Sequence, residues 1–389
     1  MDDPPLRILF AAPAWWPSRA FGGPIPVARE LVRRLVERGH SVDVVTTTLL
    51  DLHGRPTRRS AVAEVDGATV RYLATPIRYR WMGITPGLPL ALARLPRPDV
   101  GHVFGFRDPV TTGTAAWLRV RRIPYVFEPL GMFRPRLRKV RLKRALDATL
   151  YRGVVRGAAA VVVASERERD DVLACGVPSA KVHVRGNGFP EPREHGADRE
   201  LRSRLGIPEE AALILYVGRI ASGKGIEHLL AVADELPEAH VVLAGPDDRH
   251  GMAALVRRAG ESGRVHALPP TDEPPLDLYP QADVFVLASA GESFGMVAAE
   301  AAAAGTPVVV SDRCGIAPFF EDGEALVVPY EREAVVEAVR CVVSDPDLRD
   351  RLSRGGVEAT RRNSWDRVTD VQEEIYRAVA GAEVTRATG

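Results

Sequence analysis

The sequence has few cysteines and no long apolar run. Only three of its 389 residues are cysteines, Cys175, Cys314 and Cys341, and no two of them form a Cys-x-x-Cys pair. This scarcity argues against a disulfide framework or a zinc site, so we expect all three to be small buried hydrophobic residues. No run reaches the ~18 apolar residues of a membrane-spanning helix, and no signal-peptide pattern follows Met1, so we expect a cytoplasmic protein.

The sequence also lacks an excess of one charge, since its formal net charge is +1. This balance conceals a division: residues 1–190 hold 31 Lys and Arg against 16 Asp and Glu, a net +15, and residues 191–389 hold 21 against 35, a net −14. A basic half attracts anionic partners such as diphosphates, nucleic acid or an acidic membrane surface. We expect no nucleic-acid partner, because no helix-turn-helix, zinc-finger or aromatic RNA-binding motif is present.

What the sequence does contain is two successive alternations of apolar, β-branched runs with amphipathic stretches. The first predicts strands at residues 7–12, 42–47, 69–73, 100–104, 124–127 and 160–164, with helices at 27–38, 111–121, 137–155 and 166–175. The second predicts strands at residues 213–217, 240–244, 264–267, 283–288 and 307–310, and ends in helices at 333–343, 346–361 and 365–380. Alternation of this kind predicts an α/β protein with two Rossmann-like parallel sheets, each covered by helices on both faces.

Glycine and proline concentrate at residues 185–192, which marks a linker between the two alternations. We therefore predict an N-terminal domain over residues 1–188, a C-terminal domain over 189–362 and a terminal helix and tail over 363–389. Two such domains in tandem form a cleft where the carboxyl ends of both sheets face each other.

The most informative segment reads Gly291-Glu292-Ser293-Phe294-Gly295-Met296-Val297-Ala298-Ala299-Glu300. It joins a predicted buried strand to an alanine-rich helix, with one carboxylate before the helix and one on it. The first amides of a helix lack intrahelical partners and carry the positive end of its dipole, so a diphosphate can bind there without a metal ion. Eight helical residues span at most about 12 Å, so both carboxylates can flank one nucleotide-sugar. The alternative is a solvated loop and helix with two exposed glutamates.

Two other glycine-containing turns follow predicted strands. Gly218-Arg219 ends the first strand of the second alternation, and Lys224 follows in a Gly/Ser turn before a helix. Such a pair of cations can neutralise a diphosphate leaving group, the guanidinium through forked hydrogen bonds and the ammonium as a point charge. Gly22-Gly23 precedes the first helix and permits close approach of a ligand, although a loop that needs positive φ explains it equally well.

Taken together, these motifs resemble those of glycosyltransferase family 4, whose members have the two-domain GT-B fold. Gly22-Gly23, Gly218-Arg219 with Lys224-Gly225, and the Glu292/Glu300 pair occur in the family's order and spacing, and Ser364-Trp365 resembles the start of its closing helix, which crosses back to the first domain. The resemblance covers essentially the whole chain. It implies a retaining glycosyltransferase that moves a sugar from a nucleotide-diphosphate sugar to a glycan, lipid-linked or secondary-metabolite acceptor.

The resemblance also implies roles for individual residues. Arg219 and Lys224 would hold the donor diphosphate and act in catalysis with Glu292, which would contact the donor sugar, while Glu300 would contact the ribose. The remaining donor-binding positions would be Gly22, Gly23, Gly218, Phe294, Gly295, Met296 and Val297. The family generally works without a catalytic metal, so we expect no cofactor, and the single Asp-x-Asp motif, at Asp345 and Asp347, lies at a predicted helix start. Two alternatives remain, a GT-B phosphorylase or epimerase and a nucleotide-sugar-binding protein without turnover.

One departure from the family concerns the acceptor side. Members often carry a histidine in a Pro-His-Gly-Met segment, where this chain has Leu130, which can neither exchange a proton nor donate a hydrogen bond. His102 and Glu128 are the substitute candidates, although a histidine in a strand is more often a core residue, and the leaving phosphate itself is a further alternative. Trp15 and Trp16 are candidates to line the acceptor, or else belong to the core.

Residues 134–144 hold seven cations in eleven positions. They form either a solvated helix face or a basic edge that contacts an anionic membrane or a diphosphate-linked acceptor, with Arg78, Arg80 and Trp81 nearby. The second interpretation predicts a peripheral location at the inner face of the cell membrane.

Overall fold

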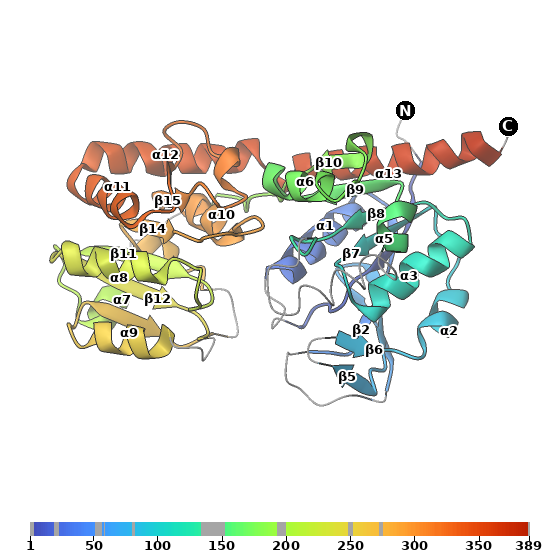
Figure 1. The fold of residues 1–389 in the computed structure, drawn as a ribbon, viewed down its shortest axis with the longest axis horizontal. Helices are drawn as coiled ribbons and strands as arrows, with labels where there is room; N and C mark the ends of the chain where they lie inside the picture. The colour runs from blue at the N-terminus through green and yellow to red at the C-terminus, as the bar shows by residue number, and fades with distance from the viewer. Residues whose placement is uncertain are drawn as a thin grey trace. The chain divides into compact units, whose positions relative to one another are not determined.

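A computed structural model of the chain describes residues 4–18, 23–50, 57, 59–79, 82–133, 152–192, 200–247, 252–271 and 275–387. The chain forms two compact units (Figure 1). Unit 1 comprises Met1–Gly186 and Trp365–Gly389, and unit 2 comprises Asn187–Ser364. The boundaries predicted from the sequence fall after residues 188 and 362. The two chain segments that enter and leave unit 2 pair with each other, since the Phe189 amide donates to the Asn363 carbonyl at 2.8 Å.

Unit 1 contains an eight-stranded sheet in the order β10-β9-β8-β7-β1-β2-β4-β3. The strands are β1 (Arg7–Ala11), β2 (Ser41–Thr47), β3 (Ala61–Val65), β4 (Ala68–Leu73), β7 (Val100–Phe104), β8 (Tyr125–Glu128), β9 (Ala160–Val163) and β10 (Val182–Val184). All neighbours are parallel except β3, which pairs antiparallel with β4. Strand order reverses between β1 and β7, which defines a topological switch point.

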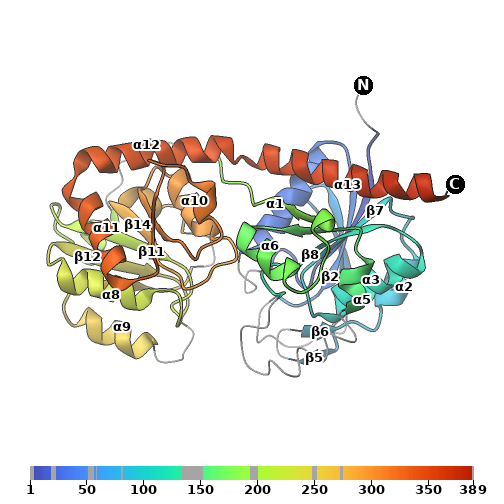
Figure 2. The same cartoon turned by 45° about the horizontal axis from the view of Figure 1, so that its top comes forward.

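The helices of unit 1 lie on both faces of this sheet. They are α1 (Pro24–Glu37), α2 (Leu88–Ala93), α3 (Pro109–Val120), α5 (Arg152–Gly157), α6 (Glu166–Leu173), η2 (Ser179–Lys181) and α13 (Trp365–Ala387). Because parallel crossovers are right-handed and run in opposite directions from the switch point, α1 and α3 cover opposite faces. α13 packs beside α1 and against β7 and β8 (Figure 2). A two-stranded hairpin, β5 (Ile77–Tyr79) and β6 (Met82–Ile84), follows β4.

Unit 2 contains a six-stranded parallel sheet in the order β13-β12-β11-β14-β15-β16. The strands are β11 (Ala212–Val217), β12 (Ala239–Ala244), β13 (Val265–Leu268), β14 (Val284–Leu287), β15 (Val308–Ser311) and β16 (Leu326–Val328). In chain order this is the 3-2-1-4-5-6 arrangement of dinucleotide-binding folds, and its switch point lies between β11 and β14. All residues of these two strands are buried, as expected for apolar runs inside a sheet covered on both faces.

The helices of unit 2 are α7 (Glu200–Leu205), α8 (Ile226–Glu235), α9 (Met252–Gly260), α10 (Met296–Ala303), α11 (Arg332–Ser344) and α12 (Pro346–Arg362), with short turns η3 (Tyr279–Gln281) and η4 (Ala317–Phe319). α8 packs against β12, α9 and α11, whereas α10 packs against β14, β15 and α12. The sheet is therefore covered on both faces, and α8 and α10 each begin at its carboxyl edge.

Within the described residues the predicted α/β alternation is confirmed, but most of the predicted helix at 137–155 lies outside them. Two details differ from the sequence predictions. Strands β3, β10 and β16 and the β5–β6 hairpin were not predicted. Only Cys314 of the three cysteines is buried: Cys175 is exposed in the turn after α6, and Cys341 lies on the half-exposed side of α11. In the part of the chain that the structure describes, no helix is both long and apolar enough to cross a membrane.

Candidate functional site

Two loops meet at the switch point of the unit 2 sheet. One follows β11 and carries Arg219 and Lys224, and the other follows β14 and carries Glu292. They adjoin because β11 and β14 are neighbours in the sheet. The loops also approach very closely: Gly225 has φ +74°, and a Cβ at this position would lie 1.7 Å from the carbonyl oxygen of Ala288. A glycine is therefore required for the loops to meet.

The turn that carries Arg219 is fixed by backbone hydrogen bonds on both sides. The Gly218 amide donates to the Ala244 carbonyl and the Ile220 amide to the Pro246 carbonyl, each at 2.9 Å, so the turn is attached to the last residue of β12 and to the segment after it. Gly218 has φ +147°, a value that glycine adopts easily. The Arg219 side chain is exposed to solvent. The turn thus presents a guanidinium at the carboxyl edge of the sheet.

Lys224 and Glu292 contact each other directly. The Lys224 ammonium donates to Glu292 Oε2, and the two side chains are 21% and 26% exposed. The structure therefore brings together two of the three residues predicted to act in catalysis. An ammonium paired with a carboxylate at the edge of a sheet remains open to an incoming anion, because part of each group still faces solvent.

The loop of Glu292 is supported from behind by the segment after β15. The Glu292 amide donates to the Arg313 carbonyl at 3.3 Å, and the Gly315 amide donates back to the Glu292 carbonyl at 3.1 Å. Between these residues lies Cys314, whose thiol is buried; burial raises the pKa of this thiol. Cys314 therefore serves as packing behind the loop, and a neutral thiol is a poor nucleophile.

Helix α10 begins directly after this loop. Gly295 caps it with φ +115°, and a Cβ there would lie 2.9 Å from the Leu287 side chain. Phe294 is buried and its ring packs edge-on against Phe189 and Phe319, at centroid distances of 6.2 and 5.1 Å. Phe294 can therefore offer a ligand only its backbone. The Ala298 amide donates to the Gly295 carbonyl at 2.9 Å, so the amides of this turn that suit an anion are those of Met296 and Val297.

Glu300 lies on the second turn of α10. Its Oε2 accepts a hydrogen bond from the Tyr279 hydroxyl at 2.7 Å, and Tyr279 is buried. The carboxylate of Glu300, the predicted ribose contact, is therefore oriented by a buried tyrosine.

The glycine pair before α1 falls partly outside the described residues, since Gly22 does. Gly23 caps α1 with φ −51° and ψ −30°, which are ordinary right-handed helical values. A Cβ on Gly23 would meet no atom within 4 Å. The need for a positive φ, one explanation of this pair, is therefore wrong at Gly23.

His102 and Glu128 belong to a buried network in unit 1. His102 Nδ1 lies 2.6 Å from the Tyr376 hydroxyl of α13, and its Nε2 lies 3.2 Å from Glu128 Oε2. Arg185 donates to both carboxylate oxygens of Glu128, at 3.0 and 3.1 Å, and to Gln372 at 2.8 Å. Burial lowers the pKa of His102; burial alone would raise the pKa of Glu128, but Arg185 holds it below its ordinary value.

This network corrects the prediction that His102 and Glu128 serve the acceptor. His102 is 0% and Glu128 1% exposed, so neither side chain reaches solvent. Their partners hold α13 against the sheet, which is a structural role. The alternative of a core histidine is the one that the structure supports.

Trp15 and Trp16 follow β1 at the carboxyl edge of the unit 1 sheet. Trp15 is 1% exposed and packs edge-on against Phe10, with ring centroids 5.6 Å apart, so it is a core residue and cannot line an acceptor site. Trp16 is half-buried, and the guanidinium of Arg29 lies 4.3 Å above its ring. Of the two, only Trp16 is accessible to a ligand.

Leu130 lies in the loop after β8 in an unusual backbone conformation. Its φ is +57°, in the left-handed region that branched residues rarely adopt. The loop is held by two charged groups: Arg107 donates to the carbonyls of Met132 and Phe133, and Glu168 accepts from the amides of Gly131 and Ala164. Burial raises the pKa of Glu168 to about 7.

Residues 134–144, Arg80 and Trp81 lie outside the described residues, whereas Arg78 is described and half-buried on β5. In the described part of the chain, no group of three or more His, Cys, Asp or Glu side chains converges as metal ligands. Asp345 caps α12 by accepting from the Leu348 amide at 3.0 Å.

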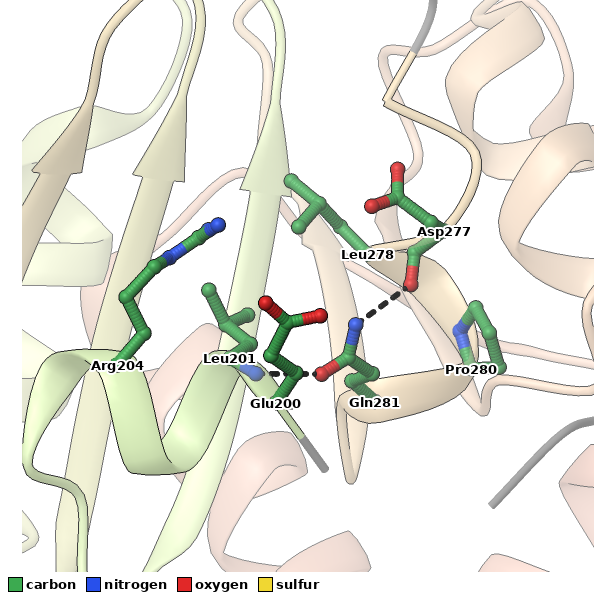
Figure 3. A pocket seen from close by; sticks show the side chains of 7 residues that line it. All are labelled: Glu200, Leu201, Arg204, Asp277, Leu278, Pro280 and Gln281. Carbon is green, nitrogen blue, oxygen red and sulfur yellow. Dashed lines mark hydrogen bonds between the residues drawn. The ribbon is translucent and has the colours of Figure 1, made fainter. Parts of the chain in front are cut away.

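A pocket in unit 2 lies away from these loops. Figure 3 shows its lining by Glu200, Leu201, Arg204, Asp277, Leu278, Pro280 and Gln281. The Gln281 amide bridges its two walls, since Gln281 accepts from the Leu201 amide at 2.8 Å and donates to the Asp277 carbonyl at 2.9 Å. These segments precede β11 and β14, so the pocket lies toward the amino ends of the strands and includes none of the predicted site residues.

Sequence reasoning missed the buried hydroxyl residues that support the site. Tyr216 lies in β11, Ser289 follows β14, and Ser311 ends β15. Each is a polar residue at the carboxyl end of an otherwise apolar strand. That pattern was visible in the sequence.

Comparisons with known proteins identify the family of the chain. The chain matches the family model described as glycosyl transferases group 1 over residues 197–358 and the glycosyl transferase 4-like domain over 22–188. It is 31% identical to the D-inositol 3-phosphate glycosyltransferase of Xylanimonas cellulosilytica over 91% of each chain. Among solved structures, sucrose-phosphate synthase from Thermosynechococcus elongatus superposes with a TM-score of 0.76 at 22% identity, covering 97% of this chain and 100% of the other. Anabaena HepE in complex with UDP and glucose gives a TM-score of 0.74 at 18% identity, over 95% and 99%.

Proposed function

This chain belongs to the group 1 glycosyl transferases, and on that basis we propose that it transfers a sugar from a nucleoside-diphosphate sugar to a sugar-phosphate or other carbohydrate acceptor. The observation that carries the proposal is the contact between Lys224 and Glu292 at the switch point of the unit 2 sheet, with the exposed Arg219 on the same loop as Lys224. Ligands of open α/β sheets bind at this position, outside the carboxyl ends of the strands.

Within this site the cations receive the donor diphosphate. The Arg219 guanidinium is free to form forked hydrogen bonds with phosphate oxygens, and the first amides of α10 add donors and the positive end of the helix dipole. Glu292 accepts hydroxyl groups of the sugar, and Glu300 those of the ribose. Gly218 allows the backbone to approach the donor closely.

We propose that transfer retains the anomeric configuration and needs no metal. The bond between the anomeric carbon and the leaving phosphate oxygen breaks as the acceptor oxygen attacks from the same face, and the acceptor proton passes to that phosphate. His102 and Glu128 are buried, and Leu130 has no group that can accept or donate a proton. Both observations support the leaving phosphate as the base. Arg219, Lys224 and the α10 amides stabilise the charge that develops on the leaving group.

For the acceptor we propose a phosphorylated sugar or polyol. Its support is the name of the relative from Xylanimonas, a D-inositol 3-phosphate glycosyltransferase, together with the net charge of +15 in residues 1–190, which favours an anionic substrate. The basic run at residues 134–144 suits a second anionic contact, either a membrane surface or a diphosphate-linked acceptor.

The experiment is a thermal-shift screen with UDP, GDP, ADP and TDP, followed by transfer assays with the matching sugar nucleotides and a panel of sugar phosphates. We expect one diphosphate to stabilise the protein, because a ligand that binds only the folded state raises its stability. Binding without turnover of any donor would instead support a nucleotide-sugar-binding protein. Failure of all four diphosphates to bind would overturn the proposal.

A further inference from the structure

We propose that Tyr216 and Ser289 are positioning residues for the donor diphosphate. Their buried hydroxyl groups fix the backbone beside Arg219 and beside Lys224, the cations that receive the diphosphate in the function proposed above, on which this inference rests. Tyr216 is 1% and Ser289 0% exposed, so neither side chain touches a ligand directly. They act through the two cations.

Tyr216 acts on the Arg219 turn. Its hydroxyl donates to the Arg219 carbonyl at 2.8 Å. The amides on both sides of Arg219, those of Gly218 and Ile220, donate to carbonyls at the end of β12 and just after it. The Tyr216 hydroxyl thus makes a third hydrogen bond that holds the backbone of this turn. A Cβ on Gly218 would lie 2.9 Å from the same hydroxyl, so the position of the Tyr216 phenol leaves room only for glycine at residue 218.

Ser289 acts on the Lys224 turn. Its hydroxyl donates to the Gly223 carbonyl at 3.1 Å, and the Ala290 amide donates to the same carbonyl at 2.9 Å. Ser289 is held in turn, because the Ser311 hydroxyl donates to its carbonyl at 2.6 Å. The residue that precedes Lys224 is therefore attached to β14, and through Ser311 to β15.

Packing alone does not require these hydroxyl groups. The other residues of β11 are aliphatic, and a phenylalanine at 216 or an alanine at 289 would keep the apolar contacts. Burying a hydroxyl is unfavourable unless it is hydrogen-bonded. Each hydroxyl donates to the carbonyl of a diphosphate-binding cation or of the residue before it. This indicates that the two hydrogen bonds serve to hold the backbone of these two turns in place.

The test compares Tyr216→Phe and Ser289→Ala with Thr360→Val as a matched control. Thr360 is also buried in unit 2, and its hydroxyl donates to the Val357 carbonyl at 2.7 Å within α12. For each full-length variant, the dissociation constant is measured for the nucleoside diphosphate selected from UDP, GDP, ADP and TDP, and for the matching nucleoside by competition. The ratio of the two constants reports on the diphosphate contacts alone.

We expect each test variant to bind the diphosphate about three- to tenfold more weakly, the effect of one lost hydrogen bond, with nucleoside binding unchanged. Thr360→Val should alter neither constant. Wild-type diphosphate binding in both test variants would overturn the inference while leaving the proposed function intact, as would an equal loss for diphosphate and nucleoside. A wild-type protein that binds none of the four diphosphates would overturn the proposed function, and this inference with it.

Discussion

Lys224 and Glu292 form an ion pair across the two loops of the candidate site. In the function proposed above, the ammonium binds the donor diphosphate and the carboxylate binds the donor sugar. We therefore expect a diphosphate to compete with Glu292 for Lys224, and its binding to leave the carboxylate to accept sugar hydroxyl groups. The Lys224–Glu292 ion pair neutralises both charges at the edge of the sheet. We expect a ligand that carries both an anion and a hydroxylated ring to replace it.

Lys224→Ala and Glu292→Gln should each abolish measurable transfer while the protein stays folded. Both groups act where charge develops in the reaction, and the loss of one such group typically lowers the rate by ~10²–10³. Turnover is measured with the donor identified in the nucleotide screen. Arg332→Gln is the control, because Arg332 forms an exposed pair with Glu235 in the same unit. Wild-type turnover in either variant would show that the substituted residue has no role in catalysis.

Activity should survive treatment with EDTA. Arg219, Lys224 and the first amides of α10 supply the positive charge that a divalent cation provides in metal-dependent transferases. Initial rates are compared before and after chelation and dialysis. A complete loss of activity that Mg²⁺ or Mn²⁺ restores would contradict the proposed metal-free mechanism.

Arg185→Met should destabilise unit 1 by ~3–5 kcal/mol, because it leaves the buried Glu128 carboxylate without its partner. Much of this loss should be recovered in Glu128→Gln/Arg185→Met, measured by urea denaturation. Arg33→Met, which removes a half-exposed ion-pairing arginine of α1, should cost no more than ~1 kcal/mol.

The same double variant tests the chemistry. It should retain transfer at temperatures where it is folded, because Glu128 is a structural residue in the network with His102. Complete loss of transfer from the folded double variant would return Glu128 to the list of candidate bases.

Glu168→Gln should change how stability depends on pH. The pKa of Glu168 is about 7 in the folded protein against 4.5 as its ordinary value, so between these limits the folded state binds more protons than the unfolded state. The free energy of unfolding contributed by Glu168 therefore falls as pH rises from about 4.5 to 7, by about 3 kcal/mol in total. Glutamine does not titrate, and its single carbonyl oxygen keeps only one of the two amide hydrogen bonds from Gly131 and Ala164, a loss that does not depend on pH.

Unfolding in urea across pH 4.5 to 8 checks this. Relative to wild type, the variant should gain about 3 kcal/mol between the acid and alkaline ends of that range. Asp108, whose pKa burial raises to about 6, is present in both proteins and cancels in the comparison. Parallel stability profiles would contradict the raised pKa of Glu168.

Replacing Arg136, Arg138, Arg141 and Lys143 by Gln should weaken binding to anionic vesicles by several kcal/mol, at ~1 kcal/mol per cation near the surface. Raised salt should mimic the change, because such attraction is screened over ~8–10 Å. Donor binding should be unaffected. If vesicle binding and acceptor kinetics both stay at wild-type values, residues 134–144 are a solvated face.

The central strands were predictable because their residues form continuous apolar runs. β11 and β14 are buried along their whole length, which only an inner position in a covered sheet produces. β3 was missed because it is an edge strand, and four of its five residues are exposed. Its place depends on pairing with β4, which hydrophobic periodicity does not report.

The proximity of the two loops that carry Arg219, Lys224 and Glu292 was predictable for a related reason. Parallel strands end at one edge of a sheet, so the loops that follow neighbouring strands lie together. The burial of His102 could not be predicted, because its partner Tyr376 lies 274 residues further along the chain. A local pattern cannot distinguish a histidine covered by a distant helix from one that faces solvent.

The return of α13 to unit 1 has a consequence for the order in which the protein can be made. Unit 2 is encoded without interruption between β10 and α13, so all of its residues leave the ribosome before α13 does. Until then Arg185 and His102 lack Gln372 and Tyr376, and one face of β7 and β8 is uncovered. The second unit in the sequence is therefore the first that can be completed during translation. A chain cut after Ser364 would keep all of unit 2 and lose a structural element of unit 1.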